Sequence, residues 1–523
     1  MKLTKYFALL LCGGLVTACS EDYFDETDSS SLSSEQAEQA AKENPEQVLA
    51  SQLKGCYTHW NHMAGVSSND ISSHMCRGMG GIMMLSDVMS NDVSLALGSG
   101  DPWRFDHALD YGAEQYNRPY WPWSVFYTII KDANTVINIV DETGDLPAAT
   151  KHLLGQAYAF RGISHAYLAQ FYQRTYKNDY NNGGKLSTEL PCVPIRLSSK
   201  EEGSVEGRAT VEQVYTQVEK DLLKAIDYLD GYARTSKSEI DQHVAQGLLS
   251  RVYLVMNKWP EAAQMAHAAR QGYAINDLQK AASWNYQDSS NGEVLWAYIP
   301  TSSTTMQFAS WASWHSTNGP GYGGYAVGCF QLIDAALYNS IPATDVRKQL
   351  FVAPGEAIDL GSKGSIPDYA NLKFDFVSQW LGNVVYMRAS ELMLTEIEAE
   401  FMSGNTGAAQ TLLAEFMANR DPQWTAPGVL TQDYIYNQRR IELWGEGFGL
   451  FDCLRLHKAL NRSYEGTNEP KSSQINNPAF PDKIVPADDY SWIFQVPLRE
   501  INNNSSISKE DQNPLNGNAW TGK

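Results

Sequence analysis

Tryptophan, tyrosine and small polar side chains gather in two segments of the chain that have little periodicity. The first contains Asn91, Asp92 and Trp103, and the second runs from residue 296 to residue 325. Proteins bind a neutral sugar through flat aromatic faces, which cover its C–H patches, and through fixed amide or carboxylate groups, which pair with its hydroxyls. We therefore expect sugar-type binding chemistry here, with the candidate contacts Trp103, Trp311, Trp314, Tyr322, Asn91, Asp92, Trp296 and Tyr325.

Core packing is the alternative for each of these rings. Trp296 lies in the alternating run 293–299, which predicts a half-buried strand. Trp103, Trp311, Trp314 and Tyr322 have no periodic context, and these are the four rings for which we predict exposure.

Other chemistries find weaker support in the sequence. Gly319–Gly324 fits a GxGxxG pattern but has no strand before it and no helix after it, and neither a GxSxG nor a CxxC motif occurs. We therefore expect no metal and no cofactor. A glycoside hydrolase stays open as an alternative, and it would need two carboxylates about 5 to 9 Å apart. Its candidates are Asp87, Asp92 and Asp106.

The N-terminus has the form of an export signal. Lys2 and Lys5 precede an apolar run that ends in Leu15-Val16-Thr17-Ala18-Cys19, which is similar to a bacterial lipobox. We expect residues 1–18 to be removed and Cys19 to carry the acyl chains that hold the protein on outer-membrane lipid. The serine-rich and acidic residues 19–40 then predict a flexible tether.

The net charge narrows the class of ligand, and the cysteine content argues against disulfide bonds. With 40 Lys+Arg against 60 Asp+Glu, the formal charge is −20, which argues against nucleic acid as a ligand. The cysteines that remain after Cys12 and Cys19 are widely spaced and odd in number, so they do not form a disulfide framework.

Helical pairs dominate the rest of the chain. Apolar residues recur at helical spacing in 240–272, in 388–420, and in 148–172 together with 210–229, where Thr210 and Gln213 predict a capping box. Further helical patterns cover 121–140 and 430–460. The expected fold is mainly α, with about four tetratricopeptide-like pairs in one domain over 41–523, and loop-rich insertions near 57–120 and 284–385.

Several segments resemble the SusD/RagB family of nutrient-binding lipoproteins. They are AYAFRGISHAYL at 157–168, GRATVEQV at 207–214, YMRASELML at 386–394, NQRRIELWGEGFGLFDCLR at 437–455 and FQVPLREINNN at 494–504. Gly449 departs from the family pattern, which usually has arginine there. Glu442, Glu446, Asp452 and Arg455 are interpreted as an ion-pair network on neighbouring turns of one helix, with a catalytic carboxylate pair as the alternative.

The resemblance implies a non-enzymatic protein at the cell surface. It would bind an oligosaccharide through loops from the two aromatic portions and pass it to a SusC-like TonB-dependent transporter. The RagB branch of the family implies peptides as the alternative ligand.

Overall fold

The computed structural model describes residues 44–63, 72–75, 77–110, 112–176, 186–199, 206–283, 286–288, 290–475 and 477–515. The predicted signal peptide 1–18, the lipidation site Cys19 and the tether 19–40 lie outside these residues. The chain divides into two compact units, Met1–Ser51 and Gln52–Lys523, and the helices and strands named below lie in the second, except that α3 begins in the first.

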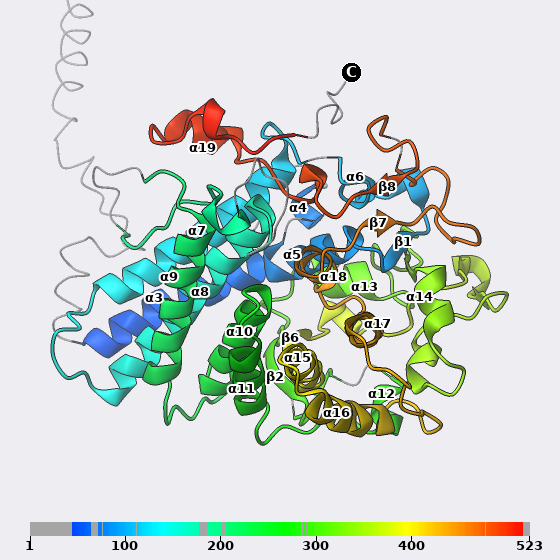
Figure 1. The fold of residues 1–523 in the computed structure, drawn as a ribbon, viewed down its shortest axis with the longest axis horizontal. Coiled ribbons are helices and arrows are strands. Elements are labelled where there is room, and N and C mark those ends of the chain that lie inside the picture. The colour runs from blue at the N-terminus through cyan, green and yellow to red at the C-terminus, as the bar shows by residue number, and fades with distance from the viewer. Residues whose placement is uncertain are drawn as a thin grey trace, which may run out of the picture. The chain divides into compact units, whose positions relative to one another are not determined.

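Helices make up most of the regular structure (Figure 1). No helix in the described ranges is both long enough and apolar enough to span a bilayer. The α-helices are α3 (Pro45–His62), α4 (Ser72–Met75), α5 (Gly78–Val88), α6 (Arg104–His107), α7 (Asn117–Asn138), α8 (Ala148–Tyr172), α9 (Val211–Tyr228), α10 (Gln242–Val255), α11 (Trp259–Ala269), α12 (Leu278–Ala281), α13 (Trp311–His315), α14 (Ala335–Ser340), α15 (Ala389–Met402), α16 (Thr406–Ala418), α17 (Gln432–Glu442), α18 (Gly449–Arg455) and α19 (Leu498–Asn503).

The long helices pack against one another as successive neighbours. Going along the row, α7 packs on α8, α8 on α9, α9 on α10, α10 on α11, α11 on α15, and α15 on α16 and α17. This confirms the mainly helical fold with tetratricopeptide-like pairs. A core of Leu394, Ile397, Leu413, Phe416 and Ile435 fills the space between α15, α16 and α17.

Local signals explain where the paired helices begin. The Thr210 side chain accepts from the Gln213 backbone N–H while the Gln213 side chain accepts from the Thr210 N–H, which is the predicted capping box of α9. Asp241 caps α10 in the same manner by accepting from Val244. Between α10 and α11, Asn257 takes a left-handed φ of 56°, which closes the turn.

Strands are short and occur as two-stranded antiparallel ladders within the described residues. β1 (Val93–Leu95) pairs with β3 (Gln331–Ile333), and β2 (Val294–Tyr298) pairs with β6 (Val384–Arg388). Two smaller ladders join β4 (Ile358–Asp359) to β5 (Ser365–Ile366) and β7 (Leu460–Asn461) to β8 (Ile484–Val485). The predicted strand at 293–299 is therefore present as β2.

The long helical pattern at 430–460 is wrong as a single helix. The structure forms α17, a turn, and then α18. Gly445 and Gly447 lie in that turn with φ of 74° and 88°, a conformation that glycine adopts without strain and that ends a right-handed helix. Glu442, Glu446 and Asp452 are consequently on α17, on the turn and on α18.

The region 57–120 is also more regular than expected. It contains α4, α5 and α6, and all residues of α5 are buried. α5 begins with Gly-Met-Gly-Gly at residues 78–81, a sequence of low helix propensity. The helix is therefore stabilised by burial of its methionines and leucine against the C-terminal segments.

Candidate functional site

The carboxylates of the C-terminal motif form the predicted ion-pair network. Arg388 contacts Glu293 at 2.7 Å, Glu442 at 2.8 Å and Glu446 at 2.7 Å, all in the interior. Glu442 also accepts from Arg420 at 2.8 Å. Burial alone would raise the pKa of Glu442, but Arg420 and Arg388 hold that pKa well below its ordinary value. These buried ion pairs connect β6 to α17, to the turn after α17 and to the residue before β2, and none of the charged groups lies at the surface.

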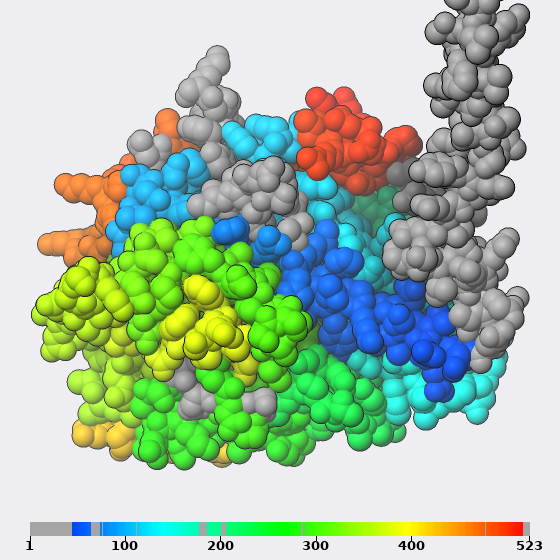
Figure 2. Space-filling model, turned by 180° about the vertical axis from the view of Figure 1, so that it is seen from behind, coloured from blue at the N-terminus to red at the C-terminus, as the bar shows by residue number. Residues whose placement is uncertain are grey.

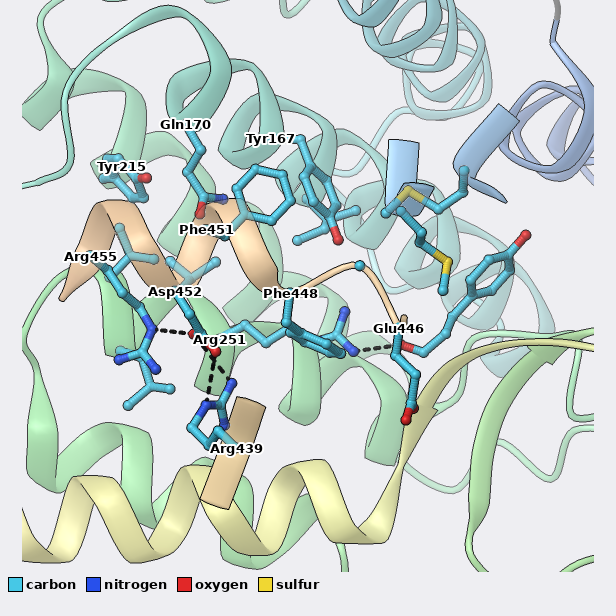
Figure 3. A pocket seen from close by; sticks show the side chains of 18 of the residues that line it. Tyr167, Gln170, Tyr215, Arg251, Arg439, Glu446, Phe448, Phe451, Asp452 and Arg455 are labelled. Carbon is cyan, nitrogen blue, oxygen red and sulfur yellow. Dashed lines mark hydrogen bonds and ion pairs between the residues drawn. The ribbon is translucent and has the colours of Figure 1, made fainter. Parts of the chain in front are cut away.

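The network continues around a small interior cavity of about 60 Å³ (Figure 3). Asp452 accepts from Arg439 at 3.2 Å and from Arg455 at 2.7 Å, and the Phe448 ring lies 5.1 Å from the Arg251 guanidinium. A cavity of ~150 Å³ is needed for a molecule of the size of benzene. The cavity therefore has room for a few water molecules but not for a sugar.

The predicted tryptophan contacts are buried. The exposed fraction of the residue is 0% for Trp103, 4% for Trp311, 2% for Trp314 and 1% for Trp296. Trp314 donates to the His74 carbonyl at 3.1 Å, and its ring stacks on Tyr322 at 4.1 Å. The prediction that Trp103, Trp311 and Trp314 are exposed is wrong, because neighbouring rings and glycine-rich backbone cover them. Trp296 is buried on β2, the strand on which it was expected.

Glycines in the 319–324 loop bring its backbone onto α13. A Cβ on Gly323 would lie 2.0 Å from the Trp314 carbonyl oxygen, so the loop wraps around the end of this helix only because side chains are absent. Tyr322, 7% exposed, is held below the surface with its hydroxyl 2.9 Å from His74 Nδ1. Tyr325 is half-buried, with the Lys363 ammonium 4.6 Å from its ring.

Asn91 and Asp92 fasten β1 to the C-terminal region. Asn91 donates to the Ala459 carbonyl at 2.9 Å and accepts from the Asn461 N–H at 2.8 Å. Asp92 is 6% exposed and pairs with Arg440 at 2.6 Å. Their polar groups are thus hydrogen-bonded within the fold, and the candidate contact Asp92 is buried rather than at the surface.

The three hydrolase candidates do not reach the surface either. Asp87, Asp92 and Asp106 are buried, and Asp106 pairs with Arg118 at 2.8 Å. Burial raises the pKa of Asp87 to about 8, and its two oxygens accept from the N–H groups of Gly447 and Gly449. Carboxylates held in this way do not form a pair across a cleft.

A different set of rings reaches the surface. We call Phe308, Phe376 and Trp380, all half-buried, the surface aromatic cluster. The Trp380 ring lies 6.1 Å from Phe308 and 5.9 Å from Phe376, both nearly perpendicular to it, and Phe308 packs 4.5 Å from Tyr322. Trp314, which stacks on Tyr322, therefore supports Phe308 of this cluster through Tyr322.

Polar groups surround the surface aromatic cluster. Asn318 is exposed, accepts from the Phe376 N–H at 2.9 Å and donates to Asp375 at 3.3 Å. Gln379 is exposed beside Trp380. Figure 2 shows this face, where the yellow segment around residues 370–385 lies among the green loops of residues 300–330.

The backbone beneath Trp380 is strained. Gln379 and Trp380 have consecutive left-handed φ angles of 60° and 55° in a 3₁₀ turn, Ser378–Trp380. Such a conformation costs on the order of 1–3 kcal/mol for each non-glycine residue and concentrates at functional sites. Within the described residues, the buried Trp380 Nε1 has no hydrogen-bond partner.

These three rings lie within the predicted loop-rich insertion 284–385, but none of them is among the predicted contacts. The available signal was the aromatic run Phe374-Asp375-Phe376 followed by Trp380, which lacks periodicity and directly precedes β6. Among the described residues no cluster of three or more His, Cys, Asp or Glu side chains is arranged to hold a metal ion.

Solved structures share this fold. The chain matches a SusD-like carbohydrate-binding protein from Bacteroides vulgatus with a TM-score of 0.73 and 23% identity, covering 90% of this chain and 98% of that one. A SusD superfamily protein from Bacteroides thetaiotaomicron matches with a TM-score of 0.70 and 22% identity, covering 90% and 99%. A laminarin-binding SusD-like protein matches with a TM-score of 0.63 and 18% identity, covering 90% and 99%.

Family models cover both ends of the helical row. Residues 22–254 match a model described as starch-binding and associating with the outer membrane, and residues 377–515 match the SusD family model. A comparison with curated protein sequences finds no match. Since the family models agree with the fold of the solved neighbours, this chain belongs to the SusD/RagB family.

Proposed function

We propose that this protein binds a neutral oligosaccharide at the outer surface of the outer membrane and delivers it to a SusC-like TonB-dependent transporter. The single observation that carries the proposal is the surface aromatic cluster, Phe308, Phe376 and Trp380, on the face that loops 300–330 and 370–385 form.

The chemistry of this face suits a sugar. Partly exposed rings offer apolar surface to C–H patches, and Asn318, Asp375 and Gln379 beside them offer amide and carboxylate groups to hydroxyls. Tyr325 remains a proposed contact on a neighbouring part of the loop. Trp314 supports the cluster through Tyr322, and Trp103 packs against Trp314. Trp311 and Trp296 are buried and are not proposed as contacts.

Anchoring and delivery rest on the sequence. Cys19 follows an apolar signal and is the proposed site of lipidation, and the tether 19–40 gives the domain reach from the membrane. The proposal includes no catalytic step, because Asp87, Asp92 and Asp106 are buried within the fold.

A binding screen with a matched pair of tryptophan variants tests the proposal. The ligands are oligosaccharides from laminarin and from starch, and a set of short peptides. Laminarin is chosen because one solved neighbour is described as laminarin-binding, and starch because one family model is described as starch-binding. We expect wild-type protein to bind one glycan class, and Trp380→Ala to weaken that binding at least tenfold, the effect of losing an aromatic anchor worth ~2 kcal/mol.

Trp259→Ala is the control, because Trp259 is also half-buried but lies at the start of α11. It should bind the glycan within about twofold of wild type. Equal binding by both variants would exclude the surface aromatic cluster as the site. Binding of peptides without any glycan would replace the sugar by the RagB-type ligand.

A further inference from the structure

A groove lies on different elements from the surface aromatic cluster. This groove has a volume of about 630 Å³, and its lining residues come from α7, the segment 196–199 and α19. Its volume falls within the ~300–1,000 Å³ typical of small-molecule sites. Its lining residues include Tyr120, Tyr127, Lys131, Arg196 and Glu500.

Hydrogen bonds fix one wall of the groove. Tyr127 donates to the Pro194 carbonyl at 2.7 Å, and Asn134 donates to the Arg196 carbonyl at 3.1 Å. The Arg196 N–H donates to His165 Nε2 at 3.3 Å, and burial lowers the pKa of His165 to about 3, which keeps this nitrogen an acceptor. The main chain that carries Arg196 is therefore held before any ligand arrives.

The groove carries more positive than negative charge. Lys131 and Arg196 line it, Arg499 stacks on Tyr120 at 4.2 Å, and Glu500 is the carboxylate among the lining residues. Arg196 Nη2 forms an ion pair with Glu500 Oε1 at 3.9 Å, a distance too long for a hydrogen bond, and that oxygen accepts from Asn504 at 2.7 Å. A local excess of cations stands out in a chain whose formal charge is −20.

We propose that this groove is a second ligand site, for an oligosaccharide that carries an anionic group, either a uronic acid carboxylate or a sulfate ester. The Arg196 guanidinium, whose side chain is 31% exposed, pairs with the anionic group, since a guanidinium forms strong charge-assisted hydrogen bonds with such oxygens. The half-buried rings of Tyr120 and Tyr127 give the sugar an apolar floor. Because none of these residues belongs to the surface aromatic cluster, ligand binding at one site can be disproved without affecting the proposal for the other.

Calorimetric titration with three probes tests the groove: trigalacturonate, a sulfated galactose oligomer and neutral galactotriose. We expect at least one anionic probe to bind. Its affinity should fall at least fivefold between 50 mM and 500 mM NaCl, because salt screens a half-exposed ion pair. Neutral galactotriose should neither bind here nor displace the anionic probe.

Arg196→Gln should lower the affinity for the anionic probe at least tenfold, and Tyr120→Ala should lower that affinity as well. Lys458→Gln is the matched control, since it removes one positive charge from a side chain of nearly equal exposure, 30%, on the far α17–α18 side of the row. It should bind within twofold of wild type. Trp380→Ala should also leave the anionic probe unaffected, which separates this site from the proposed function.

Hydrogen–deuterium exchange of the wild type gives a readout that does not depend on a variant folding. The bound anionic probe should protect peptides from α7 and α19. Protection confined to other segments, unchanged affinity in Arg196→Gln, absence of binding by both anionic probes, or equally tight binding of a glutamate-rich peptide would each overturn the proposal.

Discussion

Glu442 accepts hydrogen bonds from Arg347, Arg388 and Arg420, which come from three different parts of the chain. The sequence motif indicated that Glu442 belongs to an ion-pair network, because carboxylates and arginines alternate at helical spacing. It could not identify these partners, since Arg347 is 95 residues away and nothing in local spacing encodes that contact.

Glu442→Gln should lower the free energy of unfolding by about 3–5 kcal/mol, because the change removes the ion-pair partner of buried Arg420 and one of the partners of Arg347 and Arg388. Urea unfolding followed by circular dichroism measures this change. Asp433→Asn is the control, as it makes the same chemical change in an exposed pair with Lys458 and should cost less than about 1 kcal/mol. Equal effects of both changes would contradict the structural role of the network.

Asp87 makes stability depend on pH. Burial raises its folded-state pKa to about 8 from an ordinary value of 3.8, so between these pH values the folded state binds more protons than the unfolded state. Stability from this group is therefore greatest at low pH and is lost as pH rises towards 8. Asp87→Asn should flatten the profile of melting temperature between pH 5 and pH 8 relative to wild type, whatever its absolute stability. Parallel profiles would show that Asp87 is ionised throughout.

The aromatic residues show what residue type alone leaves open. Trp314 and Trp380 both lie in segments without periodicity, yet Trp314 stacks on Tyr322 in the interior and Trp380 reaches the surface. Exposure depends on which loop lies on top, and contacts between distant segments decide that.

At the scale of elements, helices with caps and regular apolar spacing were predicted closely. The pairs α8–α9, α10–α11 and α15–α16 match their expected ranges, since their propensity, capping and amphipathic pattern agree. α5 was missed because its Gly-Met sequence opposes helix formation, and tertiary burial overrides that preference. The break between α17 and α18 was missed because it depends on two glycine φ angles.

Gly447→Ala should destabilise the protein by more than about 1 kcal/mol, because φ is 88° and the new Cβ would lie 2.6 Å from Met83 Cγ. Thermal unfolding measures the effect. Gly144→Ala serves as the control, because nothing lies within 4 Å of its Cβ position, and it should be neutral or slightly stabilising. A neutral Gly447→Ala would mean that the α17–α18 turn tolerates another conformation.

At the scale of the molecule, the protein has two candidate ligand surfaces, an aromatic cluster and a groove, and their charged groups differ in sign. The surface aromatic cluster offers rings with amide and carboxylate neighbours, and the α7–α19 groove offers cations. The family and the mainly helical architecture followed from motifs that are local in sequence. The position of the candidate site did not, because it depends on how loops 300–330 and 370–385 meet.

The most direct test of the central claim is a crystal structure of the protein with the neutral oligosaccharide that binds it most tightly. We expect electron density for a sugar ring against the face of Trp380 or Phe376, with a hydroxyl hydrogen-bonded to Asn318, Asp375 or Gln379. Density for that ligand elsewhere on the molecule, with the surface aromatic cluster unoccupied, would contradict the account.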